Sequence, residues 1–129
     1  MVNTSDFSNL PSLEFDKKFR TDIQYEKLIS FEEKKTSEAD LNIWIEKFKK
    51  ELEKYFNIEY KSLNEELRQK RCRDLDYWVF KVEGKMSDLS KNLNLFNTIF
   101  LFQKDVPLIF NKIKDPECVR NKDTLNNLE

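Results

Sequence analysis

The chain has 129 residues, of which 36% are charged, and its 23 basic and 24 acidic residues leave a formal net charge of −1. This balance offers no general attraction for nucleic acid or for an anionic membrane surface, and we predict no nucleic-acid partner. Apolar residues make up 39% of the sequence, which supports a packed core, and only one glycine and three prolines are present. All-β folds need many tight turns, so the composition predicts helices. We expect a single domain over residues 1–129, with flexible ends at 1–10 and 119–129.

The first helix is predicted to begin at Pro11–Ser12, because Ser12 is a good N-cap residue and Glu14 falls in the first turn. Apolar residues at 13, 15, 19 and 23 then support a short helix. A charged link over residues 31–40 follows.

The clearest helix begins near Ser37, because a serine followed three residues later by Asp40 resembles a capping box. Apolar residues then follow helical spacing from Leu41 to Phe56. Asn57 is predicted to mark the end of this helix.

A long central helix is predicted next, and Ser62 with Glu65 again resembles a capping box at its start. Its apolar residues recur at alternating steps of three and four, which forms a heptad seam. The seam consists of Cys72, Leu75, Val79, Val82, Met86, Leu89, Leu93, Phe96 and Phe100. The wide apolar stripe favours burial in an antiparallel bundle, and a coiled-coil dimer seam is the alternative. Gly84 and the cluster of Ser87, Ser90 and Asn92 are candidate positions for a kink or a split.

A last short helix is predicted to begin at Asp105, with Pro107 in its first turn, and to stop at Pro116. Taken together, these elements predict an all-α fold. We expect a single helical bundle of four to five helices with one long central helix.

Residues that carry chemistry are scarce. The absence of histidine removes the commonest general base and the commonest zinc ligand, and one glycine excludes the phosphate-binding loops that need several. The basic cluster of Arg68, Lys70, Arg71 and Arg73 is flanked by carboxylates that cancel most of its field. We therefore predict no enzyme activity, no metal site and no cofactor.

The two cysteines, Cys72 and Cys118, are compatible with one disulfide or with two thiols, and the sequence does not favour either state. Cys72 lies between Arg71 and Arg73, whose charges would lower a thiol pKa. It also lies on the apolar seam, which favours structural burial or a disulfide over a reactive thiol.

No leader or membrane span is predicted from the sequence. The N-terminus lacks a basic start followed by an apolar run, so it does not indicate a signal peptide. The most apolar stretch, Leu93–Phe102, falls short of the ~18 apolar residues of a membrane helix and is broken by Asn94 and Asn97.

The segment RCRDLDYW, residues 71–78, is the most distinctive part of the chain. It resembles an element of the PIR superfamily of Plasmodium, which includes the VIR antigens of the vivax group. The matching residues are Cys72, Leu75, Tyr77 and Trp78, and the start LPSLEF, Leu10–Phe15, resembles the family's N-terminal region. Members usually carry more cysteines and a C-terminal transmembrane segment, so the resemblance implies a short or truncated member.

This resemblance implies a non-enzymatic variant antigen that is exported into the infected red cell and acts in immune evasion or in binding a host protein receptor. Within it, Cys72, Leu75, Tyr77 and Trp78 are interpreted as structural residues of the central helix. The alternative is an intracellular helical scaffold or adaptor that self-associates through the heptad seam and keeps free thiols. The sequence does not indicate the oligomeric state.

Overall fold

The structure, a computed structural model, describes residues 4–113 and residue 118. Within these residues it contains five α-helices, one π-helical segment and no strand. The elements are α1 (Thr4–Asp22), α2 (Tyr25–Ser30), α3 (Glu38–Lys54), η1 (Tyr55–Tyr60), α4 (Glu65–Leu89) and α5 (Leu93–Asn111). The predicted all-α bundle with one long helix, α4, is confirmed. The predicted flexible end at 119–129 and the predicted stop at Pro116 lie outside the described residues.

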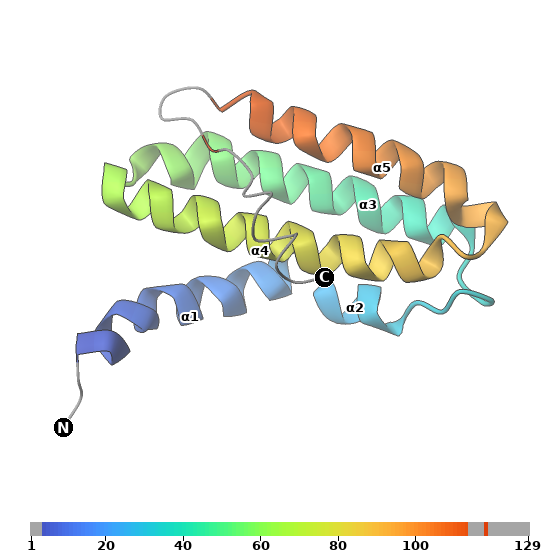
Figure 1. The fold of residues 1–129 in the computed structure, drawn as a ribbon, viewed down its shortest axis with the longest axis horizontal. Helices are drawn as coiled ribbons and strands as arrows, with labels where there is room; N and C mark the ends of the chain where they lie inside the picture. Colours follow the sequence, from blue (N-terminus) through green and yellow to red (C-terminus); the bar gives the residue numbers. More distant parts are fainter. Residues whose placement is uncertain (1–3, 114–117, 119–129) are drawn as a thin grey trace.

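Three long helices, α3, α4 and α5, lie side by side, and α1 and α2 lie against the other side of α4 (Figure 1). α3 and α5 run in the same direction, and α4 runs against both (Figure 1). α5 therefore forms one edge of the bundle, with α3 and α4 as its neighbours.

The core is rich in aromatic rings that join different helices. Phe48 of α3 stacks on Trp44 and contacts Phe19 of α1 and Phe102 of α5, with ring centroids 5.4, 6.4 and 5.8 Å away. The Trp44 indole Nε1 donates a hydrogen bond of 2.9 Å to the carbonyl oxygen of Gln24, which joins α1 to α2. Aromatic pairs of this kind add stability beyond the area that they bury.

Two helix starts that were predicted at prolines are wrong. α1 begins at Thr4, so residues 4–10 are helical and Pro11 lies inside the helix instead of at its start. Asp105 and Pro107 lie inside α5, which runs unbroken to Asn111. A proline removes one main-chain donor but holds a helical φ, and in α5 the buried Val106 and Ile109 on either side supply packing that offsets the loss.

The predicted start of α3 is confirmed, but its predicted end is wrong. The Ser37 hydroxyl accepts a hydrogen bond of 3.1 Å from the Asp40 backbone N–H. Asn57 does not end the helical path, because the chain continues through the π-helix η1 to Tyr60. The wider π-helical turn allows Phe56 to pack against both Tyr60 and Phe110 at 5.2 Å.

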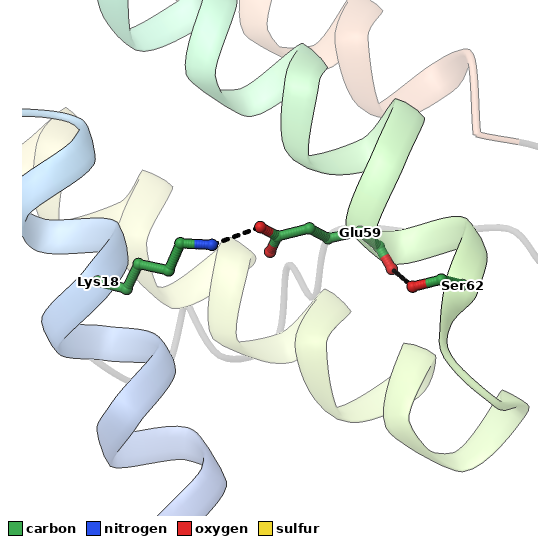
Figure 2. Close-up of polar contacts among 3 residues, drawn as sticks. All are labelled: Lys18, Glu59 and Ser62. Carbon is green, nitrogen blue, oxygen red and sulfur yellow. Dashed lines mark hydrogen bonds and ion pairs between the residues drawn. The ribbon is translucent and has the colours of Figure 1, made fainter.

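The start of α4 lies two residues after the predicted cap. Asn64 is the N-cap, and its side-chain oxygen accepts a hydrogen bond of 2.9 Å from the Leu67 N–H. The Ser62 hydroxyl instead donates to the carbonyl oxygen of Glu59 at 2.8 Å (Figure 2). Asparagine and serine are nearly equal N-caps, so the sequence alone did not separate them.

The heptad seam is divided between two helices. The break falls in the polar segment 90–92 and not at Gly84, which lies within unbroken α4. The six seam residues of α4, from Cys72 to Leu89, are buried, whereas Leu93, Phe96 and Phe100 are 86%, 52% and 46% exposed. The predicted burial of these last three is wrong, because the reversal at Asn92 gives α5 a new orientation. α5 instead buries Leu95, Ile99, Phe102, Val106 and Ile109.

Candidate functional site

The RCRDLDYW segment forms part of the core of the bundle. Leu75 and Trp78 are buried, and the Trp78 indole donates a hydrogen bond of 3.0 Å to the Asp16 carboxylate on α1. Cys72 is joined to Cys118 by a disulfide that links α4 to the chain beyond α5. Tyr77 is the exposed member of the four, at 49%. These contacts give the segment a structural role in holding α1 and Cys118 against α4.

One lysine covers the aromatic residues around this segment. The Lys81 ammonium lies 4.6 Å from the Trp78 ring centroid, 5.2 Å from that of Tyr77 and 5.5 Å from that of Tyr25. Such cation–π contacts each contribute about 0.5–1 kcal/mol at partly exposed sites. The rings therefore bind a side chain of the same protein, and they hold α2 against α4.

The basic cluster has structural contacts of its own. Arg68 donates to the carbonyl oxygens of Tyr60 and Lys61 at 3.2 and 2.8 Å, and this ties η1 to α4. Arg71 pairs with Asp74 at 3.0 Å and lies over the ring of Phe15. Burial raises the pKa of the Asp74 carboxyl, while Arg71 acts to lower it. Arg68 and Arg71 are therefore engaged in contacts within the chain, which makes them less suited to hold an anionic ligand.

A small pocket of about 170 Å³ lies where α1 meets η1. Phe15, Phe19 and Tyr55 line it, together with charged side chains of both signs. The Lys18 ammonium on α1 forms an ion pair with the Glu59 carboxylate on η1 (Figure 2). The hydrogen bond that Lys18 donates to Glu59 raises the pKa of Lys18, but both side chains are about half exposed, so the pair adds little stability. π-Helices often lie at functional sites. The paired charges and the small volume of this pocket nevertheless indicate a packing contact between α1 and η1.

No metal-binding chemistry is found in the part of the chain that the structure describes. Among residues 4–113 and 118, no three cysteine or carboxylate side chains gather in a way that suits a metal ion. In the same residues, no helix is both long enough and apolar enough to cross a membrane.

The exposed side of α5 is the most unusual surface of the bundle. We define the α5 outer face as Leu93, Phe96, Phe100, Leu101 and Leu108, which are all between 46% and 86% exposed. From Leu93 to Gln103 the helix carries no charged residue. The rings of Phe96 and Phe100 stack on each other at 6.5 Å, so they present one continuous aromatic surface.

The size of this face is notable for a small protein. Large apolar side chains expose 150–250 Å² each when free, so these five leave on the order of 500 Å² of apolar surface in contact with water. The largest apolar patch on a monomer typically covers about 300–600 Å², and that patch is often a functional surface. The sequence did contain the signal, because the uncharged run of α5 has apolar residues on both sides of the helix.

A groove between α3 and α5 adjoins this face. It has a volume of about 610 Å³, and Leu101 belongs both to its wall and to the α5 outer face. The Lys49 ammonium lies in the groove and pairs with Glu46 and Asp105, each at 3.0 Å. Burial alone would lower the pKa of Lys49, but the hydrogen bonds that its ammonium donates to Asp105 and Glu46 raise that pKa above its ordinary value. The predictions from sequence did not include this groove.

Comparison of the chain with protein-family models, curated proteins and solved structures finds no match. The resemblance of residues 10–15 and 71–78 to the PIR superfamily therefore stays a prediction, and the α5 outer face with its adjoining groove is the candidate functional site.

Proposed function

We propose that the chain is a non-enzymatic binding module of a malaria-parasite variant antigen, and that its α5 outer face contacts a host protein. The observation that carries this proposal is the exposed apolar side of α5, which carries no charged residue from Leu93 to Gln103. The family part of the proposal is supported by the sequence resemblance alone.

Physical reasons favour this face as a binding surface. Exposed aromatic rings bury a large area on contact and lose little side-chain entropy, so they serve as anchors in protein interfaces. Phe96 and Phe100 are such anchors, and Leu93, Leu101 and Leu108 extend the apolar area around them. The Lys104 ammonium lies 5.0 Å from the centroid of the Phe100 ring and falls between Leu101 and Leu108 along the helix, so a partner would meet one charged residue within the face.

The proposed place of action is the infected red cell, by export or at its surface. The Cys72–Cys118 disulfide supports passage through an oxidising compartment, since disulfides are rare in reducing ones. A tagged copy expressed in the parasite, followed by imaging of infected cells, tests this location. Retention of the tag in the parasite cytosol would contradict it.

The binding proposal is tested by surface plasmon resonance against the ectodomains of host red-cell and vascular receptors. The wild-type chain is expected to bind at least one ectodomain, and the Phe100→Glu variant is expected to bind at least about tenfold more weakly, because it places a charge in an apolar contact. Ile58→Glu is the matched control, because Ile58 is 61% exposed on η1 and lines the pocket between α1 and η1 instead of the groove between α3 and α5. Equal binding by wild-type protein and both variants would exclude the α5 outer face.

A second candidate function is self-association as a helical scaffold. The observation that favours it is the heptad spacing of Leu93, Phe96 and Phe100, all of which are exposed. Size-exclusion chromatography with light scattering distinguishes the two functions. A dimer that Phe96→Glu converts to a monomer would favour the scaffold, and a monomer at all concentrations would exclude it.

A further inference from the structure

We propose that the groove between α3 and α5 binds a helical segment of the partner, with apolar residues on one side and basic residues along its edges. This inference rests on the proposed function, because it describes the chemistry of the partner that the α5 outer face would meet.

The groove is long enough to hold a short helix. Its walls are two helices that run in the same direction side by side (Figure 1). On α3 the lining runs from Glu38 to Lys49, and on α5 it runs from Thr98 to Asp105. At a rise of about 1.5 Å per residue, the longer wall extends for roughly 16 Å, which is about three helical turns. A third helix packed between two others is the usual way in which bundles cover such a groove.

The groove has polar and apolar lining residues, and it meets the α5 outer face at Leu101. Ile45 and Phe102 are buried beneath it, and Leu101, which is 57% exposed, forms its wall on the α5 side. Ala39 adds a small side chain on the α3 side, which leaves room for a partner backbone to approach. An incoming helix would therefore bury its apolar residues against Leu101 and Ala39.

The charges around the groove select the partner. The ionisable side chains that line it are three carboxylates, Glu38, Glu46 and Asp105, and one ammonium, Lys49. Three negative charges and one positive charge leave a local charge of −2, although the chain as a whole carries only −1. Lys49 is already paired with two of the carboxylates, so it does not attract an acidic partner. Basic residues on the partner complement this rim, and acidic residues are repelled.

Two model peptides test this inference with the full chain. Both are amphipathic helices of equal length with leucine along one side, and the other side is lysine in one peptide and glutamate in the other. Isothermal titration calorimetry at physiological ionic strength is expected to show binding of the lysine peptide at least about tenfold tighter than that of the glutamate peptide. Backbone amide shifts on addition of the lysine peptide are expected over residues 38–49 and 98–105.

Two variants separate the apolar contribution to peptide binding from the electrostatic contribution. Leu101→Asn removes the apolar wall without a change in charge, and it is expected to weaken the lysine peptide by about tenfold. Glu46→Lys, at a side chain that is 51% exposed, is expected to weaken the lysine peptide by about fivefold and to strengthen the glutamate peptide. Ile58→Asn on η1 is the control and is expected to leave both affinities unchanged. Circular dichroism of each variant checks that the helices are intact.

The outcomes distinguish this inference from the proposed function. Equal affinity for the two peptides, or amide shifts that lie away from α3 and α5, would overturn the groove inference. If the groove fails while Phe100→Glu still abolishes binding to a host ectodomain, the α5 outer face acts without the groove. If the lysine peptide binds as expected and no host ectodomain does, the groove inference stands and the host-protein proposal fails.

Discussion

The helices α4 and α5 share one apolar repeat, but they use it in opposite ways. In α4 the seam from Cys72 to Leu89 faces the core, whereas in α5 its continuation, Leu93, Phe96 and Phe100, faces solvent. The polar segment 90–92 between them reverses the chain, and Asn92 fixes the turn by donating a hydrogen bond of 2.6 Å to the carbonyl oxygen of Glu33. The same apolar spacing therefore forms part of the core before the chain reversal, in α4, and part of the surface after it, in α5.

The disulfide offers the largest test of this comparison. The bond closes a loop between Cys72 and Cys118, 46 residues apart, and that loop contains the whole of α5 but not the first turns of α4. The double variant Cys72→Ser with Cys118→Ser is expected to lower the free energy of unfolding by up to about 4 kcal/mol, because the unfolded chain regains the entropy of the open loop. Urea unfolding followed by circular dichroism measures the change.

Hydrogen exchange refines the disulfide prediction. In the double variant, amides of α5 are expected to lose more protection than amides of α4, because α5 lies at the edge of the bundle. An identical urea midpoint for the oxidised and the variant protein would contradict the prediction.

Truncation of one leucine in each helix tests the two halves of the repeat directly. Leu75 of α4 is 0% exposed, so Leu75→Ala is expected to cost about 3 kcal/mol through lost burial and a cavity. Leu93 of α5 is 86% exposed, so Leu93→Ala is expected to change stability by less than about 0.5 kcal/mol. Urea unfolding of both variants gives the comparison. A similar cost at the two positions would show that the α5 outer face is covered in solution.

Local sequence signals were enough for much of the fold. The Ser37–Asp40 cap predicted the start of α3, because both partners lie within one turn. The cluster of Ser87, Ser90 and Asn92 was among the positions predicted for a split, and the break falls within it. The burial of Leu75 and Val79 followed from helical spacing, since α4 packs against neighbours along its length.

Other features depend on contacts that no local pattern encodes. The π-helical turn of η1 occurs where Phe56 packs against Phe110, which lies far along the chain. The groove joins residues of α3 and α5, and its Glu38–Thr98 hydrogen bond spans 60 positions. Which side of α5 faces water is set by the turn at Asn92 and by Phe102 packing on Phe48. The repeat alone predicted the opposite side.

Alkaline pH tests the contacts that hold the inner side of the bundle. Burial raises the pKa of the Tyr55, Tyr25 and Tyr60 phenols above the ordinary value of 10.0. A pKa raised in the folded state gives stability that is complete below the unfolded pKa and is lost as the pH rises through the folded pKa. The raised pKa of Lys49, which joins α3 to α5, acts in the same direction.

Stability is therefore expected to fall as the pH rises above the ordinary tyrosine pKa, by about 1 kcal/mol for Tyr55 alone between pH 9 and about pH 11. Urea unfolding across this range measures it, and Tyr55→Phe, which lacks the titrating group, is expected to show a shallower fall. A flat profile in wild-type protein would show that these phenols ionise as readily in the folded state as in the unfolded state.

The smallest expected effects come from exposed positions within the two helices, and they separate helix propensity from packing. A methyl group added at Gly84 of α4 would meet no atom within 4 Å, so Gly84→Ala is expected to raise stability by about 0.8 kcal/mol. Asn97→Ala on the exposed side of α5 is expected to raise stability by about 0.5 kcal/mol, because alanine favours a helix more than asparagine does. Thermal unfolding at several protein concentrations measures both. A gain at Asn97 that grows with concentration would show that the extra apolar surface is buried between copies. A gain that is independent of concentration would show that α5 leaves this side open for a different partner.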